Sequence, residues 1–246
     1  MKILRPLIIM LVLFGLWQLA DGVFHFPDYI LPSPIHIFQT GIRDANILFQ
    51  QAIPTIIETL SGLLIGCLLG MIAAIVIAYF KQARYWLLPL LLISQAIPTF
   101  AIAPLLVIWF GYGMTSKIAC TVIILFFPIT SSFYDGLRRT EKSWLDLAKT
   151  MDASKWQIFL KIRIPAALPS FATGLKVAAT LAPLGAIVGE WDGSSEGLGY
   201  LMLNANARMQ ISLMFAALFT IVVLTLILYF TVDMAAKKFI YWQREE

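Results

Sequence analysis

The chain has 246 residues, of which 60% are hydrophobic and only 13% charged, and its mean hydropathy is +0.83. Soluble domains carry about a quarter charged residues, so this composition excludes a soluble globular protein and predicts an integral membrane protein. The net charge of +4 is carried between apolar runs, which argues against a nucleic-acid-binding protein.

Six apolar segments predict an all-α protein with six transmembrane helices, because one span needs about 20 apolar residues. The segments cover residues 6–24, 59–80, 86–110, 118–133, 175–189 and 211–232. The first follows a basic start, but it is longer than a signal-peptide core and lacks a clear cleavage site, so we interpret it as a retained span. We expect a single transmembrane domain over 1–246, with an N-terminal span at 6–24, core spans within about 59–232 and a loop at 135–170.

Small residues and prolines mark the expected packing of these spans. Gly62, Gly66 and Gly70 recur every four residues and predict a face suited to close helix packing. Prolines in the third, fourth and fifth spans predict kinks, which either line a bent pathway or are ordinary kinks. Cys67 and Cys120 lie inside apolar runs and are predicted to be packing residues. Neither His25 nor His36 has ligand-spaced neighbours, so no metal site is expected.

The distribution of basic residues predicts the orientation. Of the 18 Lys and Arg residues, fifteen fall on one side of the six-span layout, and only Arg43, Lys117 and Arg208 fall on the other. Because cytoplasmic loops are enriched in basic residues, both termini and the 135–170 loop are expected in the cytoplasm. The first outer segment contains an extended stretch before Pro34, followed by either a short interfacial helix or a plain connecting loop.

A polar, basic insert separates the fourth and fifth spans. Asp135-Gly136 predicts a turn after the fourth span. Helical spacing on both sides of residues 151–154 predicts a helix–turn–helix that ends at Pro165 and Pro169, where the next span starts. Ser154 is expected to cap the second helix by accepting from the Gln157 N–H. Such an insert between spans is best explained as a docking surface for a cytoplasmic partner.

The insert resembles the cytoplasmic signature loop of inner-membrane permeases of binding-protein-dependent ABC importers. Asp146-Leu147-Ala148 stands where that family has E-A-A, and Ile162, Ile164 and Pro165 close the motif. Asp152 stands where the family has glycine. Aspartate is among the few residues that tolerate φ > 0, so we expect the turn to survive. The resemblance extends to Gly197-Leu198-Gly199-Tyr200-Leu201 and covers nearly the whole chain.

The resemblance implies a MetI-like permease bundle with a cytoplasmic coupling helix that docks on an ABC ATPase. The coupling residues that it implies are Asp146, Leu147, Ala148, Met151, Asp152, Ala153, Ser154, Trp156, Phe159 and Pro165. No G-x-x-x-x-G-K-[ST] phosphate loop exists in the chain, so the protein is expected to be no enzyme and to hold no cofactor. ATP and Mg would be bound by the ATPase, a periplasmic or lipoprotein solute-binding protein would deliver the solute, and two copies would form a homodimer in the inner membrane.

The segment after the fifth span carries the candidate substrate pathway. Glu190 is a carboxylate near membrane depth, and it either faces a pathway or marks the headgroup boundary. Glu58 is expected only to mark a boundary, and no buried Asp/Glu pair is expected. The candidate pathway residues are Gln95, Glu190, Trp191, Asp192, Ser194, Asn204 and Asn206.

Two runs, KVAATLAPLGAIVGEW and GEWDGSSEGLGYLMLNANARMQ, resemble the sulfonate/nitrate/taurine branch of the family. They are most similar to its permeases for pyrimidine precursors of thiamine. A hydroxymethylpyrimidine-type solute is therefore expected, with sulfonate, taurine, nitrate or riboflavin-like solutes as alternatives. The alternatives from other classes are an ion-coupled carrier or channel and a membrane-embedded enzyme. Both would need clustered ionisable residues at membrane depth.

Overall fold

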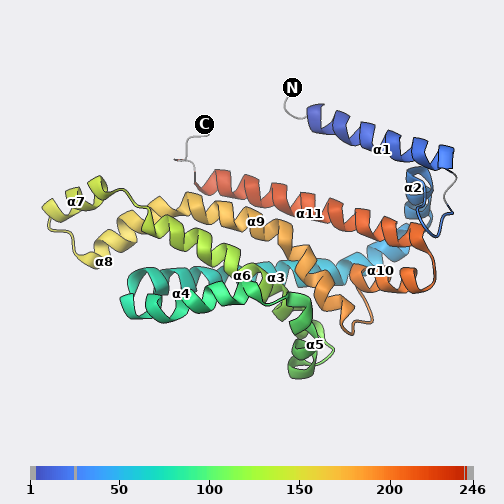
Figure 1. Ribbon diagram of the computed structural model, residues 1–246. Helices are drawn as coiled ribbons and strands as arrows, with labels where there is room; N and C mark the ends of the chain where they lie inside the picture. Colours follow the sequence, from blue (N-terminus) through green and yellow to red (C-terminus); the bar gives the residue numbers. More distant parts are fainter. Residues whose placement is uncertain (1–3, 25–26, 241, 243–246) are drawn as a thin grey trace. The chain divides into compact units, whose positions relative to one another are not determined.

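The computed structural model describes residues 4–24, 27–240 and 242, and every regular element in these ranges is a helix (Figure 1). Lys2, His25 and Arg244, which entered the predictions above, lie outside the described residues. The helices are α1 (Leu4–Phe24), α2 (Pro34–Arg43), α3 (Ala45–Tyr79), α4 (Lys81–Ala96), α5 (Thr99–Phe110), α6 (Met114–Arg138), α7 (Lys142–Thr150), α8 (Lys155–Ile158), a π-helical turn (Phe159–Arg163), α9 (Ile164–Trp191), α10 (Leu198–Ala207) and α11 (Ile211–Phe239). The chain divides into two compact units, residues 1–55 with 195–223 and residues 56–194 with 224–246.

Four helices are long and apolar enough to cross a membrane, namely α3, α6, the continuous helix Lys155–Trp191 and α11. The predicted third span is not one straight helix, because α4 and α5 meet at 104° and could form a fifth span only as a bent pair. The break falls at Ile97, whose φ of −87° and ψ of 118° are extended, as expected for a residue before a proline. The apolar part of α1, Ile8–Phe24, is shorter than the others. The count of six spans therefore stays a prediction.

The first unit is held together by aromatic rings and by a helix cap. Trp17 of α1 packs edge-on against Phe215 of α11, with ring centroids 5.7 Å apart. The N-terminus of α10 is capped from α3, where Gln51 Oε1 accepts the Gly197 N–H at 2.6 Å and Thr55 Oγ1 accepts the Leu198 N–H at 2.9 Å. These side chains satisfy donors that the first turn of any helix leaves unpaired. The segment before α3 contains a helix, α2, rather than a plain loop.

In the second unit, α6 packs between α3 and α9, and glycines make the approach possible. A Cβ on Gly62 or Gly70 of α3 would collide with Thr121 or Ile129 of α6, and one on Gly66 would lie 3.3 Å from Leu125 Cβ. The predicted packing role of these three glycines is therefore confirmed. Cys120 is fully buried in the same region and Cys67 is half-buried, and both are free thiols.

The same close packing joins α9 to α6 and yields a stability prediction. A Cβ on Gly185 would lie 2.7 Å from the Thr121 Cα, and one on Gly174 would lie 2.8 Å from the Pro128 carbonyl oxygen. Because the obstructing atoms belong to the backbone, we expect Gly185→Ala to destabilise the protein by about 1–3 kcal/mol through overpacking. The measurement is thermal unfolding in detergent.

Gly41→Ala is the matched control, because the nearest atom to its added Cβ would be Ala216 Cβ at 3.9 Å. Alanine is the better helix former by roughly 0.5–1 kcal/mol, so this variant should melt at or above the wild-type temperature. Equal melting temperatures for the two variants would contradict the packing argument.

Two boundaries of the insert were predicted wrongly. Asp135-Gly136 is no turn, because α6 continues to Arg138 and Gly136 packs against α9, where a Cβ would lie 2.8 Å from Ser170 Cβ. The second helix of the insert does not end at Pro165 either, since one helix runs from Lys155 to Trp191. Its π-helical turn is closed by an Ile164 N–H bond to the Phe159 carbonyl and ends two residues before Pro165. Such wider turns accommodate a local disruption of the α-helical bonding pattern.

Candidate functional site

The turn of the insert is built by local backbone chemistry. Asp152 adopts φ +54°, the left-handed conformation that the sequence predicted for this position. Ser154 Oγ accepts the Gln157 N–H at 3.2 Å, while Gln157 Oε1 accepts the Ser154 N–H at 2.9 Å. This capping box satisfies two donors at the start of α8. Both predictions for the turn are thus confirmed, and the turn holds α7 and α8 in a fixed register.

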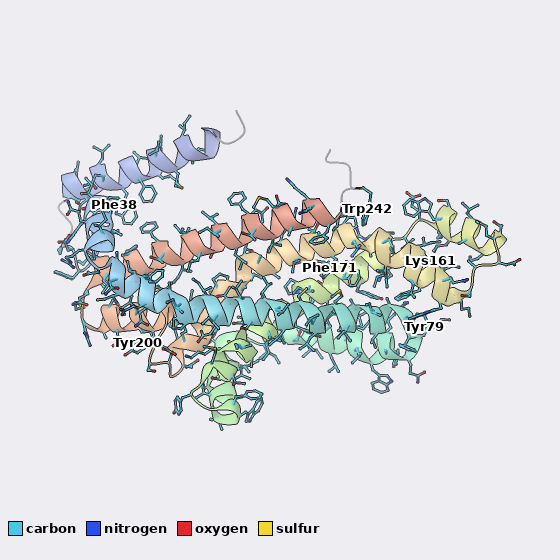
Figure 2. The ribbon with its side chains drawn as sticks, turned by 180° about the vertical axis from the view of Figure 1, so that it is seen from behind. Phe38, Tyr79, Lys161, Phe171, Tyr200 and Trp242 are labelled. Atoms are coloured by element: carbon cyan, nitrogen blue, oxygen red, sulfur yellow. The ribbon has the colours of Figure 1, made fainter. Side chains whose placement is uncertain are left out.

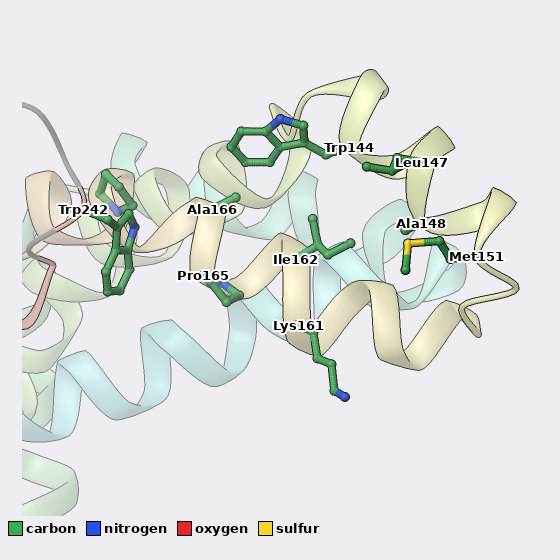
Figure 3. A pocket seen from close by; sticks show the side chains of 10 residues that line it. Trp144, Leu147, Ala148, Met151, Lys161, Ile162, Pro165, Ala166 and Trp242 are labelled. Carbon is green, nitrogen blue, oxygen red and sulfur yellow. The ribbon is translucent and has the colours of Figure 1, made fainter.

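An apolar groove of about 630 Å³ runs between α7 and the long helix that begins with α8 (Figure 3). Four predicted coupling residues line it, namely Leu147, Ala148, Met151 and Pro165. The other lining side chains were not among the predicted coupling residues and are Trp144, Lys161, Ile162, Ala166, Pro169 and Trp242. The helical spacing of 144, 147, 148 and 151 was a signal that could have found Trp144. Leu147 and Met151 are 63% and 74% exposed, so the groove presents apolar surface that a partner can cover.

The remaining predicted coupling residues lie elsewhere on the insert. Phe159 is buried in a core cluster with Phe133 and Tyr134, and Trp156 stacks on it with ring centroids 6.2 Å apart. Asp146 points to Lys149, whose Nζ lies 2.8 Å from its Oδ1. That hydrogen bond lowers the pKa of the Asp146 carboxyl. Ala153 is half-buried and donates its N–H to the Ala148 carbonyl at 3.0 Å.

A buried cluster of charges joins three helices of the second unit. Lys117 Nζ of α6 lies 3.2 Å from Glu58 Oε1 of α3, and the carboxyl of Glu190 of α9 interacts with that of Glu58. The residues Glu58, Glu190 and Lys117 are 0%, 1% and 4% exposed. The expectation that no carboxylate pair is buried is therefore wrong, and Glu58 does more than mark a boundary.

Two of these charges lie at helix ends where the helix dipole is unfavourable to them. Lys117 lies in the first turn of α6 and Glu190 in the last turn of α9. Each charge has the sign that its own helix dipole disfavours there. Gly189 allows the approach, because a Cβ on it would lie 2.8 Å from the Lys117 Cα. The Lys117–Glu58 ion pair offsets part of this cost, while the two carboxyls of Glu58 and Glu190 repel each other when both are charged.

The other candidate pathway residues are spread over both units. In the second unit, Gln95 is exposed in the last turn of α4, Trp191 is 45% exposed, and Asp192 and Ser194 are half-buried after α9. Burial raises the pKa of the Asp192 carboxyl. In the first unit, Asn204 lines a polar pocket of about 650 Å³ between α2 and the α10–α11 turn, and Asn206 is exposed. No group of three or more metal-ligating side chains occurs within the ranges that the structure describes.

The fold and the apolar helices define a helical integral membrane protein. The structure is similar to that of the methionine ABC transporter MetNI in an inward-facing conformation, with a TM-score of 0.61 over 79% of this chain and 94% of that chain, at 18% identity. The chain belongs to the family described as binding-protein-dependent transport system inner membrane component, whose model matches residues 66–241. It is thus the permease subunit of an ABC importer and not an enzyme, and the ATPase is a separate subunit.

Two relatives are similar over the whole length. A probable ABC transporter permease protein of Haemophilus influenzae is 53% identical over 240 residues, covering 98% of each chain. The formylaminopyrimidine transport permease protein ThiX of Halalkalibacterium halodurans is 36% identical over 244 residues, covering 99% of this chain and 97% of that one. Family membership decides against the carrier, channel and membrane-enzyme alternatives.

Proposed function

We propose that this permease imports a pyrimidine precursor of thiamine of the hydroxymethylpyrimidine type. The observation that carries the proposal is the 36% identity to a formylaminopyrimidine permease over nearly the full length of both chains. The likeness of the run KVAATLAPLGAIVGEW to thiamine-precursor permeases supports it. Sulfonate, taurine, nitrate and riboflavin-like solutes are the alternatives that the test must separate.

The segment after α9 offers chemistry suited to a flat, polar heterocycle. The exposed face of Trp191 can stack on an aromatic ring, and the half-buried Asp192 carboxyl can accept hydrogen bonds from ring substituents. We assign Gln95, Ser194, Asn204 and Asn206 to the same pathway as hydrogen-bonding groups. We assign Glu190 to the pathway as well, with its carboxyl held inside the cluster with Glu58 and Lys117.

The proposed mechanism is alternating access driven from the cytoplasm. The insert faces the cytoplasm in this proposal, and an ABC ATPase with bound ATP and Mg docks on the apolar groove. Closure of two ATPases pulls the insert, and the movement passes along the continuous helix Lys155–Trp191 toward the segment that carries Trp191. A solute-binding protein delivers the solute from outside, and two copies of the chain enclose the pathway.

Uptake measurements test the substrate. The permease is produced with its ATPase and binding protein in cells that cannot make the pyrimidine half of thiamine, and uptake of labelled hydroxymethylpyrimidine is followed. We expect uptake of the pyrimidine to stop when the permease is absent. Excess taurine or an alkanesulfonate should not inhibit this uptake. Permease-dependent uptake of taurine or sulfonate without uptake of the pyrimidine would overturn the substrate assignment while leaving the importer assignment intact.

A further inference from the structure

The insert has a second cavity, of about 450 Å³, on a different side from the apolar groove. Its lining residues are Ala78, Tyr79, Leu145, Lys149, Lys155, Ile158, Phe159 and Arg163. None of them lines the groove. On α7 the groove takes positions 144, 147 and 148, together with the C-cap residue 151, whereas the cavity takes 145 and 149. Residues of an α-helix separated by three or four positions share a face, so the two surfaces use separate faces of α7.

The cavity is basic. Lys149, Lys155 and Arg163 line it, and none of its lining residues is acidic. The ammonium of Lys149 is engaged by Asp146 at 2.8 Å. For Lys155 and Arg163 the structure records no ion pair among the described residues. A further cation, Arg84, contacts one of the lining residues, because its Nη2 donates to the Ala78 carbonyl at 3.4 Å. The cavity therefore presents positive charge without an internal counter-charge for Lys155 and Arg163.

The aromatic side chains at this cavity are of the kind that gathers at the level of the lipid headgroups. Tyr79 is the last residue of α3, a helix that is long and apolar enough to span a membrane. Its ring lies edge-on to Trp156 at 5.4 Å and to Phe159 at 5.1 Å, and Figure 2 shows it at the end of α3 near the helix that bears Lys161. Tyrosine and tryptophan gather at the membrane–water interface, and this pattern favours a position of the basic side chains at the level of the lipid phosphates.

We propose that this cavity binds the phosphate of an anionic phospholipid, with Arg163 and Lys155 as its main ligands and Tyr79 and Trp156 beside the glycerol region. Arginine presents a planar fork that matches phosphate oxygens, and lysine adds a mobile point charge. A lipid bound here holds the start of the long helix at the membrane surface while the apolar groove stays open to a protein partner. The inference goes beyond the proposed function and requires neither the substrate nor the ATPase.

The test measures lipid binding to the full-length permease alone. The probe is phosphatidylglycerol, added to the protein in phosphatidylcholine nanodiscs, with bound lipid counted by native mass spectrometry. Each basic residue near an anionic headgroup contributes about five-fold in affinity, so Lys155→Gln/Arg163→Gln should weaken phosphatidylglycerol binding roughly thirty-fold. The matched control, Arg139→Gln/Lys142→Gln, removes two exposed charges outside the cavity and should change binding little.

Several outcomes would overturn the proposal. The first is unchanged phosphatidylglycerol binding in the Lys155/Arg163 variant. The second is an equal loss of phosphatidylglycerol affinity in both double variants. Inorganic phosphate that displaces the lipid completely would indicate a soluble anion as the ligand. Loss of ATPase co-purification with unchanged lipid binding would assign the cavity to the ATPase. If the Lys155/Arg163 variant fails to fold, the salt dependence of the wild-type protein is the test. Its phosphatidylglycerol binding must weaken when salt is raised to about 0.5 M, and unchanged binding would overturn the proposal.

Discussion

Lys117→Met is expected to destabilise the permease by about 3–5 kcal/mol, because it removes the only cation from a buried cluster and leaves two carboxyls facing each other. The Glu58 carboxyl is fully buried and loses its 3.2 Å ion pair. The measurement is thermal unfolding in detergent together with the folded yield. Methionine keeps most of the side-chain volume, so the loss reports charge rather than a cavity.

Two further variants separate the cluster from a general effect of charge. Lys117→Met/Glu58→Gln removes one charge of each sign, so it should recover a large part of the loss in a double-mutant cycle. Lys149→Met removes the exposed partner of Asp146, and an exposed ion pair contributes little, so its melting temperature should stay near that of the wild type. A double variant no more stable than Lys117→Met alone would show that the two residues do not interact in the folded protein.

Features that depend on neighbouring residues could be predicted from the sequence. The cap at Ser154 needs only a serine and the N–H of Gln157, and the turn at Asp152 needs only a residue that tolerates φ > 0. The Gly62–Gly70 stripe follows from helical spacing alone. The family could be recognised because its signature loop is itself a local pattern. Such features are encoded within one or two helical turns.

Features that join distant segments could not be predicted in the same way. Glu58, Lys117 and Glu190 lie on three helices far apart in the chain. The basic-residue pattern places Lys117 on the outer side, and only the packing of α6 shows that it is buried. The only signal was that the outer side has just three basic residues while two carboxylates lie near membrane depth. Likewise, three prolines in the segment 86–110 predicted kinks equally well at each position. Only packing selects Ile97-Pro98 as the 104° break.

Placing carboxylates in the apolar groove is expected to abolish coupling while the permease stays folded. Leu147→Glu and Met151→Glu change exposed side chains at the groove, so neither disturbs the core. If the ATPase covers this groove, each buried charge must lose its water without a partner. Burying a polar group without a partner costs at least about 2 kcal/mol, which corresponds to roughly a thirty-fold weaker complex. Co-purification of the ATPase and solute-dependent ATP hydrolysis measure the effect.

Asp152→Gly separates contact from shape in the same experiment. Glycine adopts φ +54° more readily than aspartate and restores the residue that the family has here, so this variant should keep the turn and retain the ATPase. If Asp152→Gly alone released the ATPase, the aspartate carboxylate would be a direct contact and the interface would centre on the turn. If Leu147→Glu and Met151→Glu retained full coupling, the ATPase would have to dock on another face of the insert. Leu147 of α7 and Met151 at its C-cap line the same groove four positions apart, so a partner that covers one lies close to the other, and both single variants should lose coupling.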